Sequence, residues 1–145
     1  MLKGNIHSRF GHSHKALACF KAALDKADEE QEQDIYIQIA AECLVLEKVN
    51  QAIFWLKNLV QKRPDSIEAL YELAQIFESD KRHEEAIEFY NKSIELENED
   101  DYNYFLRGEF YQNEGNYEMA LKDFKKAREL NPDDSEYYFN EAYSY

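Results

Sequence analysis

The sequence predicts an all-α fold built from helix pairs that repeat along the chain. A skeleton of small and large apolar residues recurs every 34 residues, and each copy holds two apolar stripes at helical spacing with a polar break between them. Only 2 prolines and 4 glycines interrupt the 145 residues, so long helical segments are possible. Each copy is therefore predicted to form a helix, a tight turn and a second helix.

The clearest copy occupies residues 101–134. Small residues at Gly108 and Ala120 allow its two predicted helices to approach closely. Larger side chains at Tyr111 and Phe124 then fill the space beside them. This alternation of small and large residues predicts a tightly packed antiparallel pair.

Two further copies precede it, at residues 67–100 and 33–66. The equivalent small and large positions are Ala74, Ala86, Phe77 and Tyr90 in the first of these, and Ala40, Ala52, Cys43 and Leu56 in the second. Three copies in register at one period are difficult to obtain by chance. Since one pair cannot bury its apolar face alone, neighbouring pairs are expected to stack.

The breaks between helices carry recognisable stop and start signals. Turns within the copies are predicted near Lys48, Lys81 and Gly115. Prolines are expected to end the second helix of a copy, and short polar side chains that follow are expected to cap the next helix. These prolines are Pro64 and Pro132, and these caps are Ser66, Asp100 and Asp134.

The two ends of the chain match the skeleton only in part. Residues 1–32 are predicted to be a partial first repeat and linker, with His12 and His14 in its turn and Ala16 in its second helix. Residues 135–145 are predicted to be the first helix of a further repeat or a capping helix. One explanation for both partial ends is that the chain is a fragment of a longer repeat protein.

Charge is distributed unevenly along the chain. Residues 1–66 hold 9 Lys and Arg against 9 Asp and Glu, whereas residues 67–145 hold 8 against 21. The net charge of −13 therefore lies entirely in the second half. Such a field repels nucleic acid and anionic membrane surfaces and favours basic partners, although an acidic surface can also serve solubility alone.

Cysteine usage and hydropathy indicate the compartment. Cys19 and Cys43 are too few for a disulfide framework, and both are expected to be small buried hydrophobes in a reducing environment. No apolar run approaches the roughly 18 residues of a membrane span. The residues from Met1 to His14 also lack the apolar stretch of a signal peptide. We therefore predict a cytoplasmic location.

No pattern in the sequence points to catalysis. His7, His12, His14 and Cys19 have the residue types of a zinc site but match no compact zinc motif. The acidic run Glu97–Asp101 lacks the alternating ligands and central glycine of a calcium loop. There is no phosphate-binding glycine loop and no nucleophile elbow. The sequence therefore predicts no enzyme, no cofactor and no metal.

The pattern resembles the tetratricopeptide repeat in its period and in its alternation of small and large residues. The resemblance covers nearly the whole chain, and 101–134 matches best. It implies a single domain over residues 1–145, a right-handed superhelical solenoid with about three full repeats and partial repeats at both ends. It also implies a protein–protein interaction scaffold rather than an enzyme.

The resemblance further implies that the first helix of each repeat lines a concave groove. A groove with aromatic anchors and carboxylates would suit a basic or amphipathic peptide segment. The alternative is that these aromatic side chains mostly pack within the fold. The expected groove residues are Ile37, Ala41, Glu68, Tyr71, Gln75, Glu78, Tyr102, Phe105, Glu109, Gln112, Phe139 and Tyr143.

Two further expectations concern partners. Some members of the family bind the acidic tails of chaperones through a clamp of Lys, Asn and Arg. Here Glu68 and Glu72 stand where cations are needed, so we predict no such clamp. The alternative to peptide binding is a structural segment that packs within a larger multi-repeat protein or associates weakly with another copy through the aromatic residues of 137–145.

Overall fold

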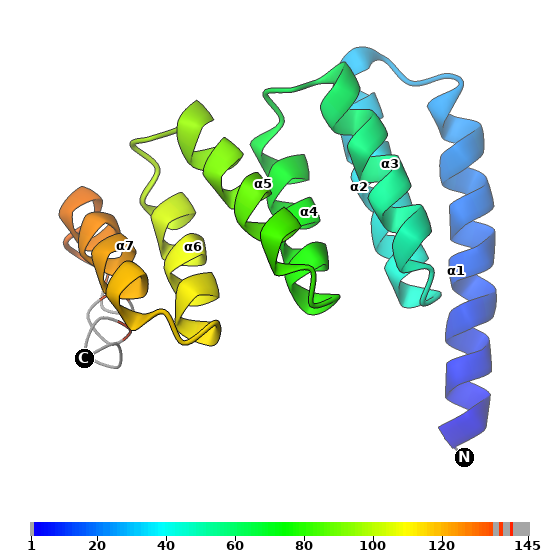
Figure 1. The fold of residues 1–145 in the computed structure, drawn as a ribbon. Coiled ribbons are helices and arrows are strands. Elements are labelled where there is room, and N and C mark those ends of the chain that lie inside the picture. The colour runs from blue at the N-terminus through cyan, green and yellow to red at the C-terminus, as the bar shows by residue number, and fades with distance from the viewer. Residues whose placement is uncertain (1, 135–136, 138–139, 141–145) are drawn as a thin grey trace. The chain divides into compact units, whose positions relative to one another are not determined.

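The computed structural model describes residues 2–134 together with Tyr137 and Asn140 (Figure 1). Over this part the chain forms seven helices and no strand, which confirms the predicted all-α fold of repeated helix pairs. The helices are α1 (Leu2–Leu24), α2 (Glu29–Val45), α3 (Val49–Lys62), α4 (Ile67–Ser79), α5 (His83–Leu96), α6 (Asp101–Asn113) and α7 (Tyr117–Leu130).

The helices repeat with the period found in the sequence. The second helices α3, α5 and α7 each have 14 residues, and their first residues Val49, His83 and Tyr117 are one 34-residue period apart. Pro64 and Pro132 stand two residues beyond the ends of α3 and α7. Proline cannot continue a helix, so its position accounts for both ends.

The turns inside the pairs share one backbone geometry. Glu47, Lys81 and Gly115 all adopt left-handed φ angles, of 58°, 61° and 76°. The residue after each of them donates its N–H to the carbonyl five residues earlier, at 2.8 Å in all three turns. This is the bond of a Schellman motif, which satisfies a carbonyl at the helix end.

Polar side chains cap the helices where the sequence predicted it. The Asp100 carboxylate accepts from the N–H of Tyr102 at 3.0 Å, and Ser66 Oγ accepts from the N–H of Ala69 at 3.4 Å. Each bond satisfies one free N–H at the start of a helix. The helix that Asp134 was predicted to cap falls largely outside the described residues.

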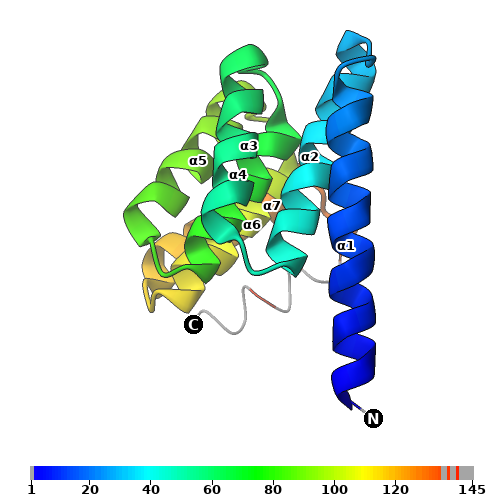
Figure 2. The same ribbon diagram turned by 90° about the vertical axis from the view of Figure 1, so that its right-hand side faces the viewer.

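The chain divides into two compact units, Met1–Ala69 and Leu70–Tyr145, with the boundary inside α4. In the first unit α1 lies alongside α2, and α3 packs against α2 (Figures 1 and 2). The rings of Tyr36 and Trp55 meet edge to face with centroids 5.5 Å apart. The core around them consists of Tyr36, Leu59 and Ala69, with Leu24, Ile37, Trp55 and Val60 packed against it.

Two expectations for the start of the chain are wrong. His12 and His14 do not form a turn, because α1 continues unbroken from Leu2 to Leu24. Gly11 weakens this helix but does not end it, since the segment contains no proline. Cys19 is exposed rather than buried. It stands two residues after buried Leu17, roughly 200° around the helix, and so faces away from the core.

Cys43 is fully buried, as predicted. Burial disfavours the charged thiolate and raises the pKa of the Cys43 thiol. Across the described part of the chain, every helix is too short or too polar to span a lipid bilayer.

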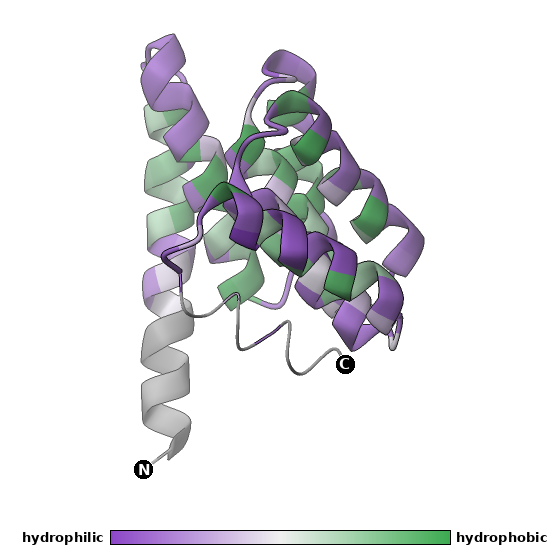
Figure 3. Ribbon diagram, turned by 90° about the vertical axis from the view of Figure 1, so that its left-hand side faces the viewer, coloured by the Kyte–Doolittle hydropathy of each residue, from purple (hydrophilic) through white to green (hydrophobic). Residues whose placement is uncertain are grey.

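In the second unit, aromatic side chains pack between the helices of each pair. Phe77 of α4 stacks on Phe89 of α5 with ring centroids 5.5 Å apart. Gly108 of α6 faces Phe124 of α7, and a Cβ atom at position 108 would lie only 2.6 Å from Phe124 Cε1. The predicted role of Gly108 in close helix approach is therefore confirmed. Figure 3 shows hydrophobic residues where helices meet and hydrophilic residues in the turns.

Candidate peptide-binding surface

One side of α4 and one side of α6 form a shared surface in the second unit, here called the α4–α6 face. Its residues recur at spacings of three, four or seven along each helix, which places them on one side. They are Tyr71, Gln75 and Glu78 from α4, and Tyr102, Glu109 and Gln112 from α6. Contacts between the two helices at both ends of this surface hold them together.

An aromatic pair marks one end of the face. The rings of Tyr71 and Tyr102 meet edge to face, with centroids 6.0 Å apart and planes at 85°. Tyr102 is 48% exposed, so much of its side chain is open to a ligand. The Tyr71 hydroxyl donates to the side-chain oxygen of Asn103, and it lies 3.4 Å from a carboxylate oxygen of Asp100. Burial, followed by the nearby Asp100 charge, raises the pKa of Tyr71, so its hydroxyl stays a donor.

A fixed carboxylate marks the other end. Glu78 accepts from the Tyr90 hydroxyl at 2.8 Å and from Asn113 Nδ2 at 3.1 Å. Tyr90 is only 2% exposed, and burial together with Glu78 raises the pKa of its phenol. Two neutral donors on two neighbouring helices therefore hold the half-buried Glu78 carboxylate in one orientation.

Phe105 was predicted to line the open surface, but it does not. It is 5% exposed, and its ring lies 5.1 Å from that of Tyr137 and 5.9 Å from that of Phe124. It also stacks on Tyr102 at 6.2 Å. Phe105 therefore supports Tyr102 from within the core instead of contacting a ligand.

The remaining predicted residues are spread over other parts of the chain. In the first unit Ile37 packs against the core, whereas Ala41 and Glu68 are exposed. Within the α4–α6 face Gln75 is exposed, and Glu109 and Gln112 are half-buried. The predictions for Phe139 and Tyr143 fall outside the described residues.

Tyr137 is the first residue of the aromatic segment that was considered for self-association. It is 3% exposed, and its hydroxyl donates to Asp101 Oδ2 at 2.5 Å. This hydrogen bond is the main cause that lowers the pKa of Asp101. Tyr137 therefore packs within its own unit and is not available as a contact surface.

Sequence reasoning missed the supporting residues Asn103, Tyr90 and Asn113. Asn103 is 1% exposed, and its Nδ2 donates to the carbonyl of Glu97 at 3.1 Å. One signal was present, because Asn103 is a polar residue at the position that Ala69 occupies one repeat earlier. Among the described residues, no three His, Cys, Asp or Glu side chains are grouped to hold a metal ion.

These features define an all-α helical-repeat protein with an aromatic and acidic face. Family models of the tetratricopeptide repeat match residues 67–100 and 103–134. These two segments are therefore tetratricopeptide repeats, and the chain shares the all-α repeat fold of protein–protein interaction scaffolds. No curated protein is similar enough in sequence to count as a match.

Solved structures share the fold. A crystal structure of MamA is 21% identical with a TM-score of 0.75, over 93% of this chain and 78% of MamA. A tetratricopeptide repeat protein from Parabacteroides merdae is 19% identical with a TM-score of 0.78, over 96% of this chain and 58% of its own. YrrB, described as a TPR protein with an unusual peptide-binding site, is 20% identical with a TM-score of 0.72, over 96% and 71%. At these identities the likeness concerns the fold alone.

Proposed function

We propose that this chain is a non-enzymatic scaffold whose α4–α6 face binds a basic, amphipathic segment of a partner protein. The observation that carries the proposal is the combination of an open aromatic side chain with a fixed carboxylate. Tyr102 offers the apolar contact, and Glu78 offers the charge. Tyr71, which packs on Tyr102, and Glu78 are seven residues apart on α4, which is roughly 10 Å. A segment with a Lys or Arg at about that distance from an apolar anchor matches both.

The face is organised before any ligand binds. Tyr102 is held between the rings of Tyr71 and Phe105, and Glu78 is held by two hydrogen bonds. Ordering side chains on binding costs about 0.5–1.5 kcal/mol for each flexible group. Side chains that are already ordered avoid this cost, so a few contacts can supply useful affinity.

Long-range electrostatics favour the same partner. Residues 67–145, which contain the face, hold 21 acidic residues against 8 basic ones. Such an excess attracts a basic segment and repels an acidic one, and the attraction weakens as salt screens it. YrrB has the same fold and is described as having an unusual peptide-binding site, which supports a peptide as the class of ligand.

Fluorescence anisotropy with a labelled Lys- and Leu-containing peptide tests the proposal, at low and at moderate salt. We expect Tyr102→Ala and Glu78→Gln each to weaken binding by about 10-fold, or roughly 1.4 kcal/mol. Glu118→Gln is the matched control, because it removes the same charge from an exposed position on α7. If Glu78→Gln and Glu118→Gln weaken binding equally, general acidity and not this face is responsible.

A further inference from the structure

A second polar surface of this unit lies between α6 and α7. It is a cleft of about 410 Å³, here called the α6–α7 cleft. Its wall on α6 contains Tyr104 and Arg107, each two residues away from Tyr102 or Glu109 of the α4–α6 face. Two residues correspond to roughly 200° around a helix, so the cleft opens on nearly the opposite side of α6. Its lining residues are Tyr104, Arg107, Lys122, Asp123, Lys125, Lys126 and Glu129.

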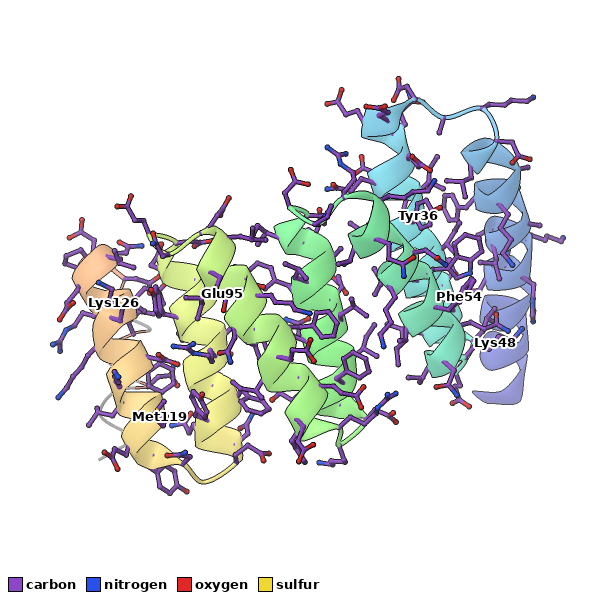
Figure 4. All side chains as sticks on the ribbon, turned by 45° about the horizontal axis from the view of Figure 1, so that its top comes forward. Tyr36, Lys48, Phe54, Glu95, Met119 and Lys126 are labelled. Carbon is purple, nitrogen blue, oxygen red and sulfur yellow. The ribbon has the colours of Figure 1, made fainter. Side chains whose placement is uncertain are left out.

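The cleft concentrates positive charge in an acidic region. Four of the 8 basic residues of 67–145 line it, together with only two of the 21 acidic residues. Three of these basic residues lie within five positions of α7, namely Lys122, Lys125 and Lys126. Figure 4 labels Lys126 on this helix. The local charge is therefore opposite in sign to that of the surrounding surface.

The floor of the cleft is held by hydrogen bonds, and its charges balance. Arg107 donates to both carboxylate oxygens of Asp123, at 2.7 and 2.8 Å, and to Asn91 Oδ1 at 2.9 Å. Its guanidinium also lies 5.9 Å from the ring centroid of Tyr104 and 6.0 Å from that of Tyr111. Because Arg107 neutralises Asp123, the excess charge of the cleft comes from the lysines.

Glu129 lies at the rim of the cleft and competes only weakly with a ligand for Lys126. Lys126 Nζ lies 3.9 Å from Glu129 Oε2, and the two side chains are 45% and 67% exposed. An exposed pair at this distance contributes little, so a ligand carboxylate can replace Glu129 at small cost.

We propose that the α6–α7 cleft binds an acidic segment of a partner protein, with its carboxylates on Lys122 and Lys126 and an apolar side chain against Tyr104. Charge complementarity selects this occupant, since the cleft is positive although the surrounding surface is acidic. The proposal does not rest on the function of the α4–α6 face, because the two surfaces lie on different sides of α6. Together they would let one unit hold a basic and an acidic partner.

The test uses a labelled Glu- and Leu-containing peptide, with a version in which every Glu is replaced by Gln. We expect the acidic peptide to bind at low salt and the Gln version to bind at least about 10-fold more weakly. The double variant Lys122→Glu/Lys126→Glu should weaken binding of the acidic peptide by more than about 10-fold. Lys81→Glu/Lys92→Glu is the control, since it makes the same charge change in the same unit away from the cleft.

Three results would overturn the proposal. The first is an absence of binding at about 1 mM peptide in low salt. The second is an equal loss of affinity in the control variant, which would indicate general charge effects. The third is wild-type self-association that the Lys122→Glu/Lys126→Glu variant abolishes while the peptide fails to bind, because the occupant would then be a second copy of this chain. Circular dichroism and urea unfolding check that each variant is folded.

Discussion

Arg107 on α6 donates two hydrogen bonds to the carboxylate of Asp123 on α7, at 2.7 and 2.8 Å. The Asp123 side chain is 2% exposed and that of Arg107 is 18% exposed, so the pair is largely withdrawn from water. Arg107 also donates to Asn91 on α5. One side chain therefore connects three helices of the second unit, and the connection depends on a charge that only Asp123 balances at this site.

Removing Asp123 is expected to destabilise the protein strongly. Asp123→Ala leaves the Arg107 guanidinium buried without its partner, and we expect the free energy of unfolding to fall by about 3 kcal/mol. Urea unfolding monitored by circular dichroism measures this. The exposed substitution Lys126→Ala should change it by less than about 0.5 kcal/mol.

The double substitution Arg107→Met/Asp123→Leu distinguishes two causes of that loss of stability, an unpartnered buried charge and lost packing. It removes both charges at once, so it should cost less stability than Asp123→Ala alone. A double variant as unstable as Asp123→Ala would show that packing, and not an unpartnered charge, is responsible.

The turns offer a way to stabilise the protein. Glu47 and Lys81 adopt the left-handed φ that Gly115 adopts one or two periods later. This conformation costs a residue with a Cβ atom about 1 kcal/mol. We expect Lys81→Gly to raise the free energy of unfolding by about 0.5 kcal/mol, since greater freedom of the unfolded chain offsets part of the gain.

Two further substitutions check that explanation by chemical denaturation. Gly115→Ala should lower the free energy of unfolding by about 1 kcal/mol, and Lys81→Ala should leave it nearly unchanged. Stabilisation by Lys81→Ala equal to that by Lys81→Gly would mean that the charge of Lys81, and not its backbone angle, is unfavourable.

The sequence predicted what depends on local spacing. The 34-residue period located the helix pairs, and the polar breaks located the turns around Lys81 and Gly115. The same reasoning failed in α1, where a turn was predicted at His12 and His14, next to Gly11. A glycine lowers helix propensity by only about 1 kcal/mol, and packing of α1 against α2 outweighs that cost.

The candidate surfaces were predicted only in part, because they depend on contacts between distant residues. The resemblance to the tetratricopeptide repeat implied that Tyr71, Glu78 and Tyr102 share one surface, and contacts between α4 and α6 join these residues. The sequence could not show that Tyr137 covers Phe105, which lies 32 residues earlier in the chain. Nor could the sequence pair Arg107 with Asp123, since spacing does not show which charged residues form a buried ion pair and which lie at the surface.

The contact between Gly108 and Phe124 makes a third prediction. Gly108→Ala adds a Cβ atom that would lie 2.6 Å from a fully buried ring. Overpacking of this kind costs about 1–3 kcal/mol, whereas the alanine gains up to about 1 kcal/mol of helix propensity. We therefore expect a net loss of about 1 kcal/mol in thermal or urea unfolding.

A matched control separates these two terms. Gly11→Ala in α1 adds a Cβ atom with no other group within 4 Å, so it should stabilise the protein by about 0.5–1 kcal/mol. In a Phe124→Leu background, Gly108→Ala should become neutral or stabilising. Destabilisation of the same size in both backgrounds would contradict the steric explanation.

The buried phenol of Tyr90 predicts a sensitivity to alkaline pH. Burial, with a further contribution from Glu78, raises the pKa of Tyr90 above the value near 10 of an unfolded tyrosine. The folded protein therefore keeps a proton that the unfolded chain loses. This contribution to stability is complete below about pH 10 and declines above it, by up to about 1.4 kcal/mol for each pH unit.

Tyr90→Phe removes this titration and should flatten the decline, as urea unfolding between about pH 8 and pH 11 can measure. At neutral pH the variant should lose about 1 kcal/mol, because the half-buried Glu78 loses a hydrogen bond. Tyr117→Phe, on the exposed surface of α7, should keep the wild-type slope. If Tyr90→Phe also keeps that slope, the proton of Tyr90 does not contribute to alkaline unfolding.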